Sequence, residues 1–113
     1  MLARENRLRQ AADITRVYKK GAYGASGGVL SVKAAYSGRS HLRAVVVVGK
    51  KVSKRAVVRN RLRRRVIGDL ERSWTTLKTG YDIVVSVHQD VSEMLAGELS
   101  DHLSRALTRA GVK

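Results

Sequence analysis

The chain of 113 residues contains no cysteine, no proline and no phenylalanine. The missing cysteine excludes disulfides and cysteine-ligated metal sites. The missing proline means that loops must be located from glycine and serine alone. Long hydrophobic runs are missing too, since the longest, Ala44–Val48, is far below the roughly 20 residues of a membrane span. Because no signal-peptide pattern follows Met1 either, we expect a soluble, cytoplasmic protein that does not enter a membrane.

Acidic residues are scarce, with 9 Asp and Glu against 23 Lys and Arg and a net charge of +14. A charge of this size predicts a polyanionic partner, either nucleic acid or an anionic membrane surface. The excess is concentrated in residues 49–66, which hold 9 basic residues and no acidic one. With 43% apolar residues, the chain is too hydrophobic for a disordered basic tail. We therefore expect a folded domain with one strongly basic segment.

Hydrophobic periodicity predicts one α+β domain over residues 1–113, a two-layer α/β sandwich in the order α-β-β-β-α-β-α. The first helix should have Asp13 as its N-cap and should end at Gly21. Residues 22–28 are rich in glycine and small side chains, which leaves two possibilities open, a loop or an irregular edge strand.

Three further segments have the composition of strands. Residues 29–36 and 42–49 should pair as a hairpin around the turn at residues 37–40, and residues 81–88 should form another strand. Ala44–Val48 is apolar at every position. That pattern favours a central place in the sheet, covered on both faces.

Two longer helices complete the expected fold. The helix at about residues 54–73 has an apolar row at i, i+4 spacing that should face the core, formed by Val58, Leu62, Val66 and Leu70. The last helix should begin between Glu93 and Gly97 and stop at Gly111. Its own apolar row consists of Leu95, Leu99, Leu103 and Leu107.

The side of the helix at residues 54–73 that faces away from its apolar row is almost entirely cationic. At about 100° per residue, Asn60 and Arg64 lie opposite the row and the other arginines lie on its two flanks. Arg59 with Arg63, and Arg61 with Arg65, form like-charge i, i+4 pairs that destabilise an isolated helix. Phosphate groups would offset that repulsion, and the arginine guanidinium binds phosphate with two parallel hydrogen bonds. The residues alone therefore predict nucleic-acid binding and leave RNA and DNA open.

The same segment resembles a known family signature. Gly49-Lys50-Lys51-Val52 followed by Ala56-Val57-Val58-Arg59-Asn60-Arg61-Leu62-Arg63-Arg64 is similar to the motif of the bacterial ribonuclease P protein component. The resemblance extends to Asn6-Arg7-Leu8, to residues 13–18 and to residues 81–85, and so covers nearly the whole chain. It implies a central sheet flanked by helices, in which the arginine-rich helix is part of a left-handed βαβ crossover.

The resemblance also implies a function. The protein would assist a catalytic RNA in the Mg²⁺-dependent endonucleolytic removal of the 5′ leader from precursor tRNA, with one protein per RNA. The protein would supply no catalytic residue and bind no metal or cofactor by itself. The implied contacts to the RNA subunit are Lys50, Lys51, Arg55, Arg59, Asn60, Arg61, Arg63, Arg64 and Arg65. The implied contacts to the leader are Ile14, Tyr18, Arg7, Arg9 and Val32.

The chain departs from the family pattern at three positions. Gly49 stands where the family has serine, Ser53 where it has glycine, and Ile14 where it has phenylalanine. A leader cleft would therefore lack one aromatic platform, and stacking on such a platform contributes about 1–3 kcal/mol per base. The remaining candidates for stacking are Tyr18, Tyr23 and Tyr36.

Two alternatives to this function remain open. The first is a general structured-RNA or ribosome-binding module with no role in tRNA processing. The second is an independent protein nuclease, which is disfavoured because the acidic residues do not group into a two-metal site. The three histidines, His41, His88 and His102, are scattered along the chain without metal-ligand spacing, and we expect them to be surface or packing residues.

Overall fold

The computed structural model describes residues 2–113, and its helices and strands follow the predicted order. Strand β1 occupies the segment for which a loop and an edge strand were both possible. The elements are η1 (Arg4–Asn6), α1 (Ala11–Lys20), β1 (Ala22–Ser26), β2 (Leu30–Tyr36), β3 (Arg43–Val48), α2 (Ala56–Arg72), η2 (Trp74–Thr76), β4 (Tyr81–Val87) and α3 (Ala96–Arg109). None of the helices in this described part is long and apolar enough to cross a membrane.

The strands form one sheet in the order β1-β2-β4-β3. Strand β4 pairs antiparallel with β2 and parallel with β3, so it separates the two strands that were expected to form a hairpin. The hairpin prediction is wrong because β4 offers a better neighbour to both strands. Its residues Ile83, Val84 and Val85 are all buried, so this strand is apolar on both faces and takes the central position.

The central position predicted for Ala44–Val48 is wrong for the same reason. Strand β3 is an edge strand of the sheet, and only one of its faces is fully buried. Ala44 and Val46 point into the main core, whereas Val45 and Val47 remain half-exposed on the other face. The outer edge of β3 is covered by the N-terminal segment, where the Leu8 amide donates to the Ala44 carbonyl at 3.0 Å.

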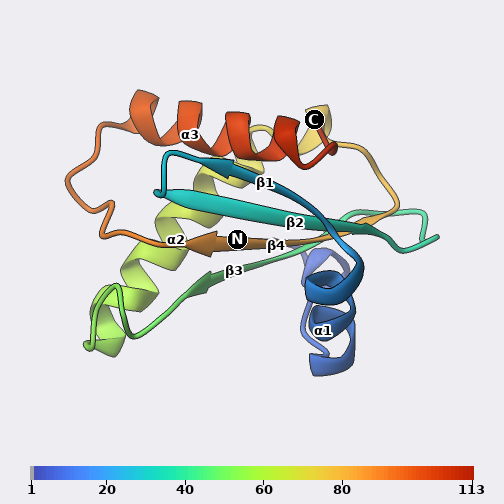
Figure 1. The fold of residues 1–113 in the computed structure, drawn as a ribbon, viewed down its shortest axis with the longest axis horizontal. Coiled ribbons are helices and arrows are strands. Elements are labelled where there is room, and N and C mark those ends of the chain that lie inside the picture. Colours follow the sequence, from blue (N-terminus) through green and yellow to red (C-terminus); the bar gives the residue numbers. More distant parts are fainter. Residues whose placement is uncertain (1) are drawn as a thin grey trace.

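Helix α2 connects the parallel neighbours β3 and β4. In Figure 1 both strands point to the left, β4 lies above β3, and α2 passes behind them. This arrangement is a left-handed crossover, which is rare because the twist of strands strongly favours the right-handed form. The structure confirms the hand that the family resemblance implied.

Helices α2 and α3 pack on one face of the sheet and form the main core with it. Most residues of the predicted apolar rows supply this contact, since Leu62, Val66 and Leu70 of α2 and Leu99, Leu103 and Leu107 of α3 are all buried. Val58 is only half-buried. The prediction is wrong for Leu95, which is 70% exposed at the N-cap of α3. Helix α1 lies on the opposite face, where Val17 is fully buried and Ile14 half-buried against Val84. That face is covered only at one end, because α1 has 10 residues.

The start of α1 differs from the prediction. The helix begins at Ala11 with Gln10 in the N-cap position, and Asp13 lies within its first turn. Asp13 does not cap the helix because its carboxylate faces Arg43 of β3, at 3.4 Å.

Gly24 explains how β1 can lie directly under α3. A Cβ atom at this position would come within 2.3 Å of the Ala106 carbonyl oxygen and 2.4 Å of the Ala110 amide nitrogen. Only glycine permits such a close approach of two backbones. The small residues of the segment at 22–28 therefore belong to a packed edge strand.

The core role of the α2 row leads to a stability prediction. Leu62→Ala should lower the free energy of unfolding by roughly 2–5 kcal/mol, because it removes a fully buried side chain and leaves a cavity. Urea denaturation followed by circular dichroism measures the change. Val57→Ala is the matched control, since Val57 lies on the same helix and is 60% exposed. If both variants unfold at the same urea concentration, the row does not anchor the helix.

Candidate nucleic-acid interface

The outward side of α2 is an ordered cationic surface. Asn60, Arg61 and Arg64 are exposed, and Arg59 and Arg63 are half-buried along their stems. The Arg63 guanidinium donates to the Asn60 side-chain oxygen at 2.5 Å, and Arg59 donates to the Ser53 carbonyl at 2.9 Å. These contacts use only part of each guanidinium, so both arginines are held in place with donors still available to a ligand.

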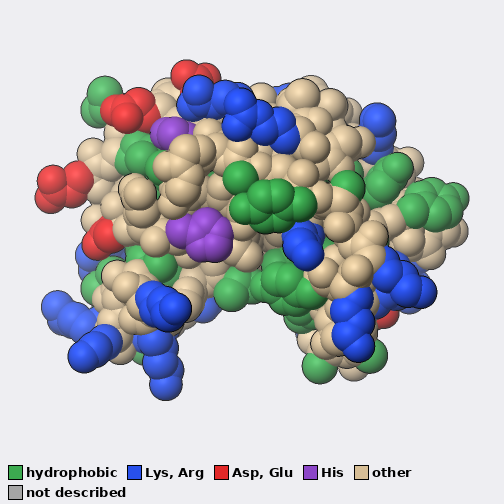
Figure 2. Space-filling view, in the orientation of Figure 1, with side chains coloured by type: hydrophobic (Ala, Val, Ile, Leu, Met, Phe, Trp, Pro, Cys, Tyr) green, Lys and Arg blue, Asp and Glu red, His purple; other side chains and the backbone are tan. Residues whose placement is uncertain are grey.

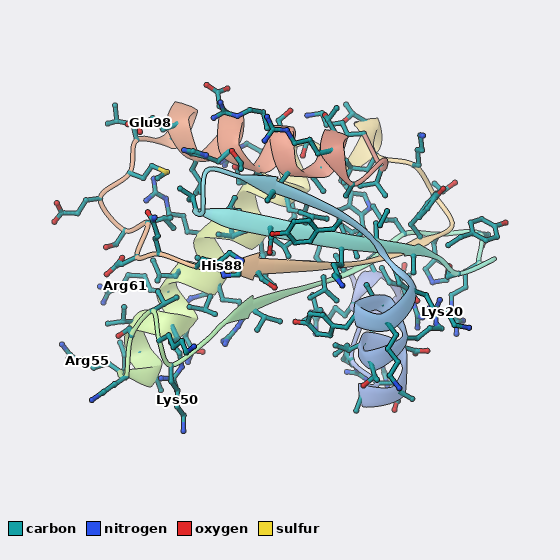
Figure 3. All side chains as sticks on the ribbon, viewed as in Figure 1. Lys20, Lys50, Arg55, Arg61, His88 and Glu98 are labelled. Atoms are coloured by element: carbon teal, nitrogen blue, oxygen red, sulfur yellow. The ribbon has the colours of Figure 1, made fainter. Side chains whose placement is uncertain are left out.

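The turn before α2 extends this surface. Lys50, Lys51 and Arg55 are exposed, and Figure 3 shows Lys50, Arg55 and Arg61 projecting from the same end of the molecule. The first turn of α2 contains no acidic residue, although a carboxylate there would be favoured by the helix dipole. The amide groups at the start of the helix therefore add to the positive potential of the side chains. Together, Lys50, Lys51, Arg55, Arg59, Asn60, Arg61, Arg63 and Arg64 form what we call the α2 surface.

Arg65 does not belong to the α2 surface, although it was predicted to contact RNA. Its side chain is half-buried, and its two terminal nitrogens donate to the carbonyl oxygens of Val91 and Met94. Both acceptors lie in the segment that leads into α3. Arg65 therefore ties α2 to that segment, and both of its terminal nitrogens are engaged by these carbonyl oxygens.

A groove lies beside the α2 surface on the sheet face that α1 leaves open. Figure 2 shows a hollow between two groups of Lys and Arg side chains, one over the start of α2 and one over α1. Along β3 and β4 the open face carries Val45, Val47 and Ser86, all half-exposed. At the end near α2, the groove opens into a pocket of about 350 Å³ that includes Lys50 and Lys51. The groove thus combines an apolar floor with cationic ends.

Tyrosine side chains are available at this groove. Tyr18 is 42% exposed and follows Ile14 by one helical turn, so the two lie on the same flank of α1. Tyr23 is 60% exposed and pairs with Lys33 across β1 and β2, on the open face. Tyr36 lies elsewhere, since its ring packs edge-on against Tyr81 at a centroid distance of 5.7 Å. Tyr18 and Tyr23 are therefore the aromatic candidates for stacking in the groove.

The structure separates the other residues predicted to contact a leader. Val32 is fully buried in the main core, on the sheet face that α2 and α3 cover, so it cannot line the groove. The alternation of side chains along β2 places Ser31 and Lys33 on the open face instead. Arg7 and Arg9 are exposed in the segment that runs beside β3, at the border between the groove and α2.

Lys33, Ser86 and His88 are groove residues that the sequence reasoning did not single out. Lys33 donates to the Tyr18 carbonyl at 2.7 Å and so links β2 to α1. His88 is hydrogen-bonded to Ser31 at 2.7 Å. The sequence signal that could have identified Lys33 was the alternation of Ser31 and Lys33 with buried valine and leucine along β2. It could not be used without knowing which face α1 leaves open.

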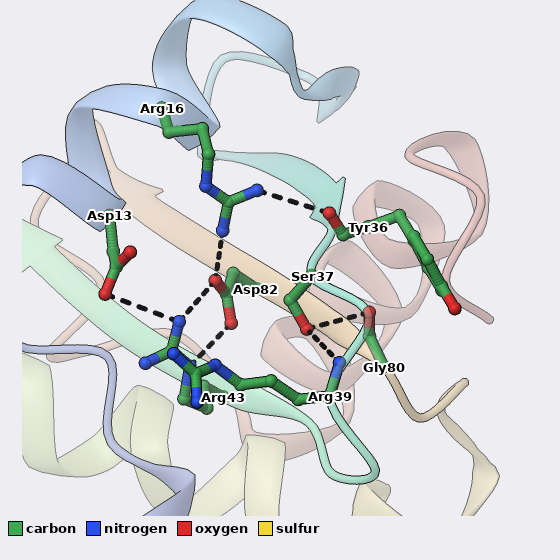
Figure 4. A network of polar contacts seen from close by, with 8 residues as sticks. All are labelled: Asp13, Arg16, Tyr36, Ser37, Arg39, Arg43, Gly80 and Asp82. Atoms are coloured by element: carbon green, nitrogen blue, oxygen red, sulfur yellow. Dashed lines mark hydrogen bonds and ion pairs between the residues drawn. The ribbon is translucent and has the colours of Figure 1, made fainter.

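A buried carboxylate fixes the position of α1 over the sheet. Asp82 at the start of β4 is fully buried and accepts two hydrogen bonds from Arg43, at 2.7 and 2.6 Å. Arg16 of α1 also donates to Asp82 and reaches the Tyr36 carbonyl at 3.2 Å. Figure 4 shows these contacts together with the Asp13–Arg43 pair. Helix and sheet are thereby joined at the closed end of the groove.

The same network changes the titration of one member. The hydrogen bond to Asp82 raises the pKa of Arg43 above its ordinary value, with further contributions from the charges of Asp82 and Asp13 and with burial acting in the opposite direction. Arg43 therefore stays charged throughout the physiological pH range, and its role in holding α1 does not depend on physiological pH changes.

Within residues 2–113, no three His, Asp or Glu side chains are grouped so that they could hold a metal ion. His102 is hydrogen-bonded to Ser26 at 2.7 Å and so links α3 to β1. Acidic side chains gather around the start of α3, at the upper left of Figure 2 and away from the hollow at the bottom of the view.

The protein is a small α+β sandwich with a cationic helix beside an open sheet groove. This architecture and charge define a nucleic-acid-binding protein. A family model described as Ribonuclease P matches residues 2–111. The chain belongs to this family, which confirms the resemblance seen in the motif at residues 49–64.

Individual relatives match over nearly their whole length. The chain is 40% identical over 114 residues to the ribonuclease P protein component of Pseudanabaena sp. (strain PCC 6903), covering 99% of this chain and 97% of the relative. It is 30% identical over 127 residues to that of Cyanothece sp. (strain PCC 7425), covering 99% and 97%.

Solved structures agree with the fold. The Staphylococcus aureus RNase P protein superposes with a TM-score of 0.80 at 26% identity, covering 95% of this chain and 96% of the other. The RNase P protein from Thermotoga maritima superposes with a TM-score of 0.79 at 26% identity, covering 91% and 96%. The four-stranded sheet flanked by helices is therefore the family's fold, as the resemblance implied.

The buried network leads to a second stability prediction. Asp82→Asn should lower the free energy of unfolding by about 3 kcal/mol, because it leaves two arginine charges without their buried counter-charge. Asp13→Asn is the matched control and should cost less than about 1 kcal/mol, since its contact with Arg43 is longer and more exposed. Equal urea midpoints for the two variants would show that Asp82 does not hold the network.

Proposed function

We propose that this chain is the protein subunit of a bacterial ribonuclease P, which assists a catalytic RNA in removing the 5′ leader of precursor tRNA. The observation that carries the proposal is the placement of two different nucleic-acid surfaces side by side. The α2 surface suits the backbone of a folded RNA, and the groove suits an extended single strand. A protein with both can hold two RNAs next to each other.

The α2 surface is the proposed contact to the RNA subunit. Its exposed arginines, Arg61 and Arg64, follow each other along one helix face, and Arg59 and Arg63 are already oriented by hydrogen bonds. Guanidinium groups held in this way lose little entropy when they bind phosphate. Lys50 and Lys51 extend the contact toward the groove as mobile point charges.

The groove is the proposed site of the 5′ leader. A single strand needs a cationic path for its phosphates and apolar or aromatic surfaces for its bases. Val45 and Val47 supply the apolar floor, Tyr18 and Tyr23 supply aromatic rings, and Lys33 supplies charge within the groove. Ile14 stands where the family has phenylalanine. Tyr18 therefore takes over the stacking that it would share with this phenylalanine.

In this proposal the protein contributes positioning and charge, and the reaction itself takes place on the RNA. Two polyanions approach each other only if cations lie between them, and the release of their counterions favours the complex. The grouping of acidic residues and histidines in the described chain does not fit a Mg²⁺ site, so the proposal places the required Mg²⁺ on the RNA. The protein is proposed to act in the cytoplasm, with one protein for each RNA subunit.

The test of this function is reconstitution with a bacterial ribonuclease P RNA. Adding the protein should lower the Mg²⁺ concentration needed for cleavage of precursor tRNA and should increase the affinity for precursors that carry a leader. Protein and Mg²⁺ without the RNA should leave the precursor intact. An unchanged Mg²⁺ requirement together with unchanged substrate affinity would contradict the proposal.

A competition assay separates this function from general RNA binding. Unlabelled ribonuclease P RNA should displace the labelled RNA subunit at much lower concentration than ribosomal RNA fragments of the same length. Equal competition by both RNAs would favour a general structured-RNA module.

The contribution of the α2 surface is measured by the salt dependence of RNA binding. Arg61→Ala should weaken binding to the RNA subunit and reduce the slope of log K against log salt by about one, because one phosphate contact is lost. Its melting temperature should not change, since Arg61 is exposed. Arg105→Ala is the control, because Arg105 is exposed on α3. A slope equal to that of the Arg105→Ala variant would place Arg61 outside the contact.

The stacking role of Tyr18 is measured with two substrates. Tyr18→Ala should weaken binding of a precursor with a 5′ leader by about 1–3 kcal/mol, and should leave the affinity for mature tRNA unchanged. Tyr36→Ala is the matched control, because Tyr36 is more exposed but lies outside the groove. Equal losses for both substrates would show that Tyr18 does not contact the leader.

A further inference from the structure

A second cationic pocket lies near the start of strand β3, whereas the α2 surface begins after the end of that strand. It has a volume of about 410 Å³ and is formed by the N-terminal segment and the turn between β2 and β3. These two segments are about thirty residues apart in the sequence and meet because the N-terminal segment runs along the edge of β3. The lining residues are Arg4, Glu5, Arg7, Arg9, Gln10, Arg39, His41 and Arg43.

Most of the charge in this pocket is not neutralised by the protein. In residues 2–113, the side chains of Arg4, Arg9 and Arg39 make no hydrogen bond or ion pair, and all three are exposed. Glu5 is the single acidic side chain of the lining, and it forms no ion pair with these arginines. Arginines gathered without counter-charge repel one another, so the arrangement is stabilised when an anion enters.

The inner wall of the pocket is rigid. Arg43 is held by Asp82 and Asp13, as described above. Arg7 donates from its Nε atom to the Leu2 carbonyl at 2.9 Å, which leaves its terminal nitrogens available. Figure 4 shows the Arg39 side chain extending from its turn toward Arg43. Two fixed and three free guanidinium groups thus surround one space.

We propose that this pocket binds a backbone phosphate of RNA, as a contact separate from the α2 surface. Planar guanidinium groups bind phosphate oxygens in pairs, and several arginines around one space match the several oxygens and the repeated charge of a nucleic-acid backbone. This inference rests on the proposed function for the identity of the RNA, which is either the RNA subunit or the precursor tRNA.

The pocket is connected to the α2 surface by further cations. Arg7 and Arg9 line this pocket and also a neighbouring one of about 270 Å³, to which Arg63 and Ile67 of α2 contribute. A continuous path of arginines therefore runs from α2 past the edge of β3 to the turn at Arg39. An RNA backbone bound at α2 can follow this path, which extends the interface by the length of strand β3.

The experiment compares Arg39→Gln with Arg105→Gln, which removes the same charge from α3. Salt dependence is measured for three complexes: protein with RNA subunit, holoenzyme with leader-bearing precursor, and holoenzyme with mature tRNA. In at least one complex, Arg39→Gln should reduce the slope of log K against log salt by about one. The binding constant of that complex should fall about fivefold at physiological salt, as expected for one released counterion. The affected complex identifies which RNA supplies the phosphate.

A direct probe tests the assignment without any RNA. Titration of the full chain with inorganic pyrophosphate should shift the Nε–Hε NMR signals of Arg39 and Arg4 and leave that of Arg105 unchanged. The proposal is overturned if Arg39→Gln behaves like Arg105→Gln in all three complexes while Arg61→Ala still lowers the slope. That pattern leaves the proposed function intact. Loss of the effect of Arg61→Ala as well would instead contradict the proposed function.

Discussion

The packing of the α2 apolar row against the sheet determines how the whole molecule can meet RNA. Leu62, Val66 and Leu70 fill the core between β3 and α3, and this contact fixes the rotation of the helix about its axis. Arg61, Arg63 and Arg64 must then face outward, whatever their mutual repulsion. Burial of three large apolar side chains supplies several kcal/mol, far more than the like-charge pairs cost. The core therefore stabilises a surface that would be unfavourable on an isolated helix.

The insertion of β4 between β2 and β3 is the second constraint on the candidate site. It makes α2 a crossover between parallel neighbours, so the cationic helix begins close to the end of β3, beside the open sheet face. It also brings Asp82 next to Arg43 and Arg16, which joins α1 to one end of that face. The remaining part of the face stays uncovered and becomes the groove. The sheet order thus places the α2 surface and the groove on adjacent sides of the protein.

Local patterns in the sequence predicted the helices, most strand positions and the buried rows, because these depend on residues close together in the chain. The pairing of strands could not be predicted in this way. Nothing near residues 37–40 indicates that β4, some forty residues later, displaces the hairpin. The error at Val32 has the same origin, since alternation tells which residues share a face but not which face a helix covers. Arg65 was misassigned because its partners, Val91 and Met94, are distant in sequence and accept through backbone carbonyls.

The central claim is that α2 faces the RNA subunit while α3 faces away from it. The chain has no native cysteine, so single-cysteine variants can each carry one iron chelate that cleaves nearby RNA. Val57→Cys places the chelate on α2 without removing a proposed contact, and Glu98→Cys places it at the start of α3. In the reconstituted complex, the chelate on Val57→Cys should cut the RNA subunit at a few defined positions, and that on Glu98→Cys should give only background. Strong cleavage from position 98 with none from position 57 would contradict the account.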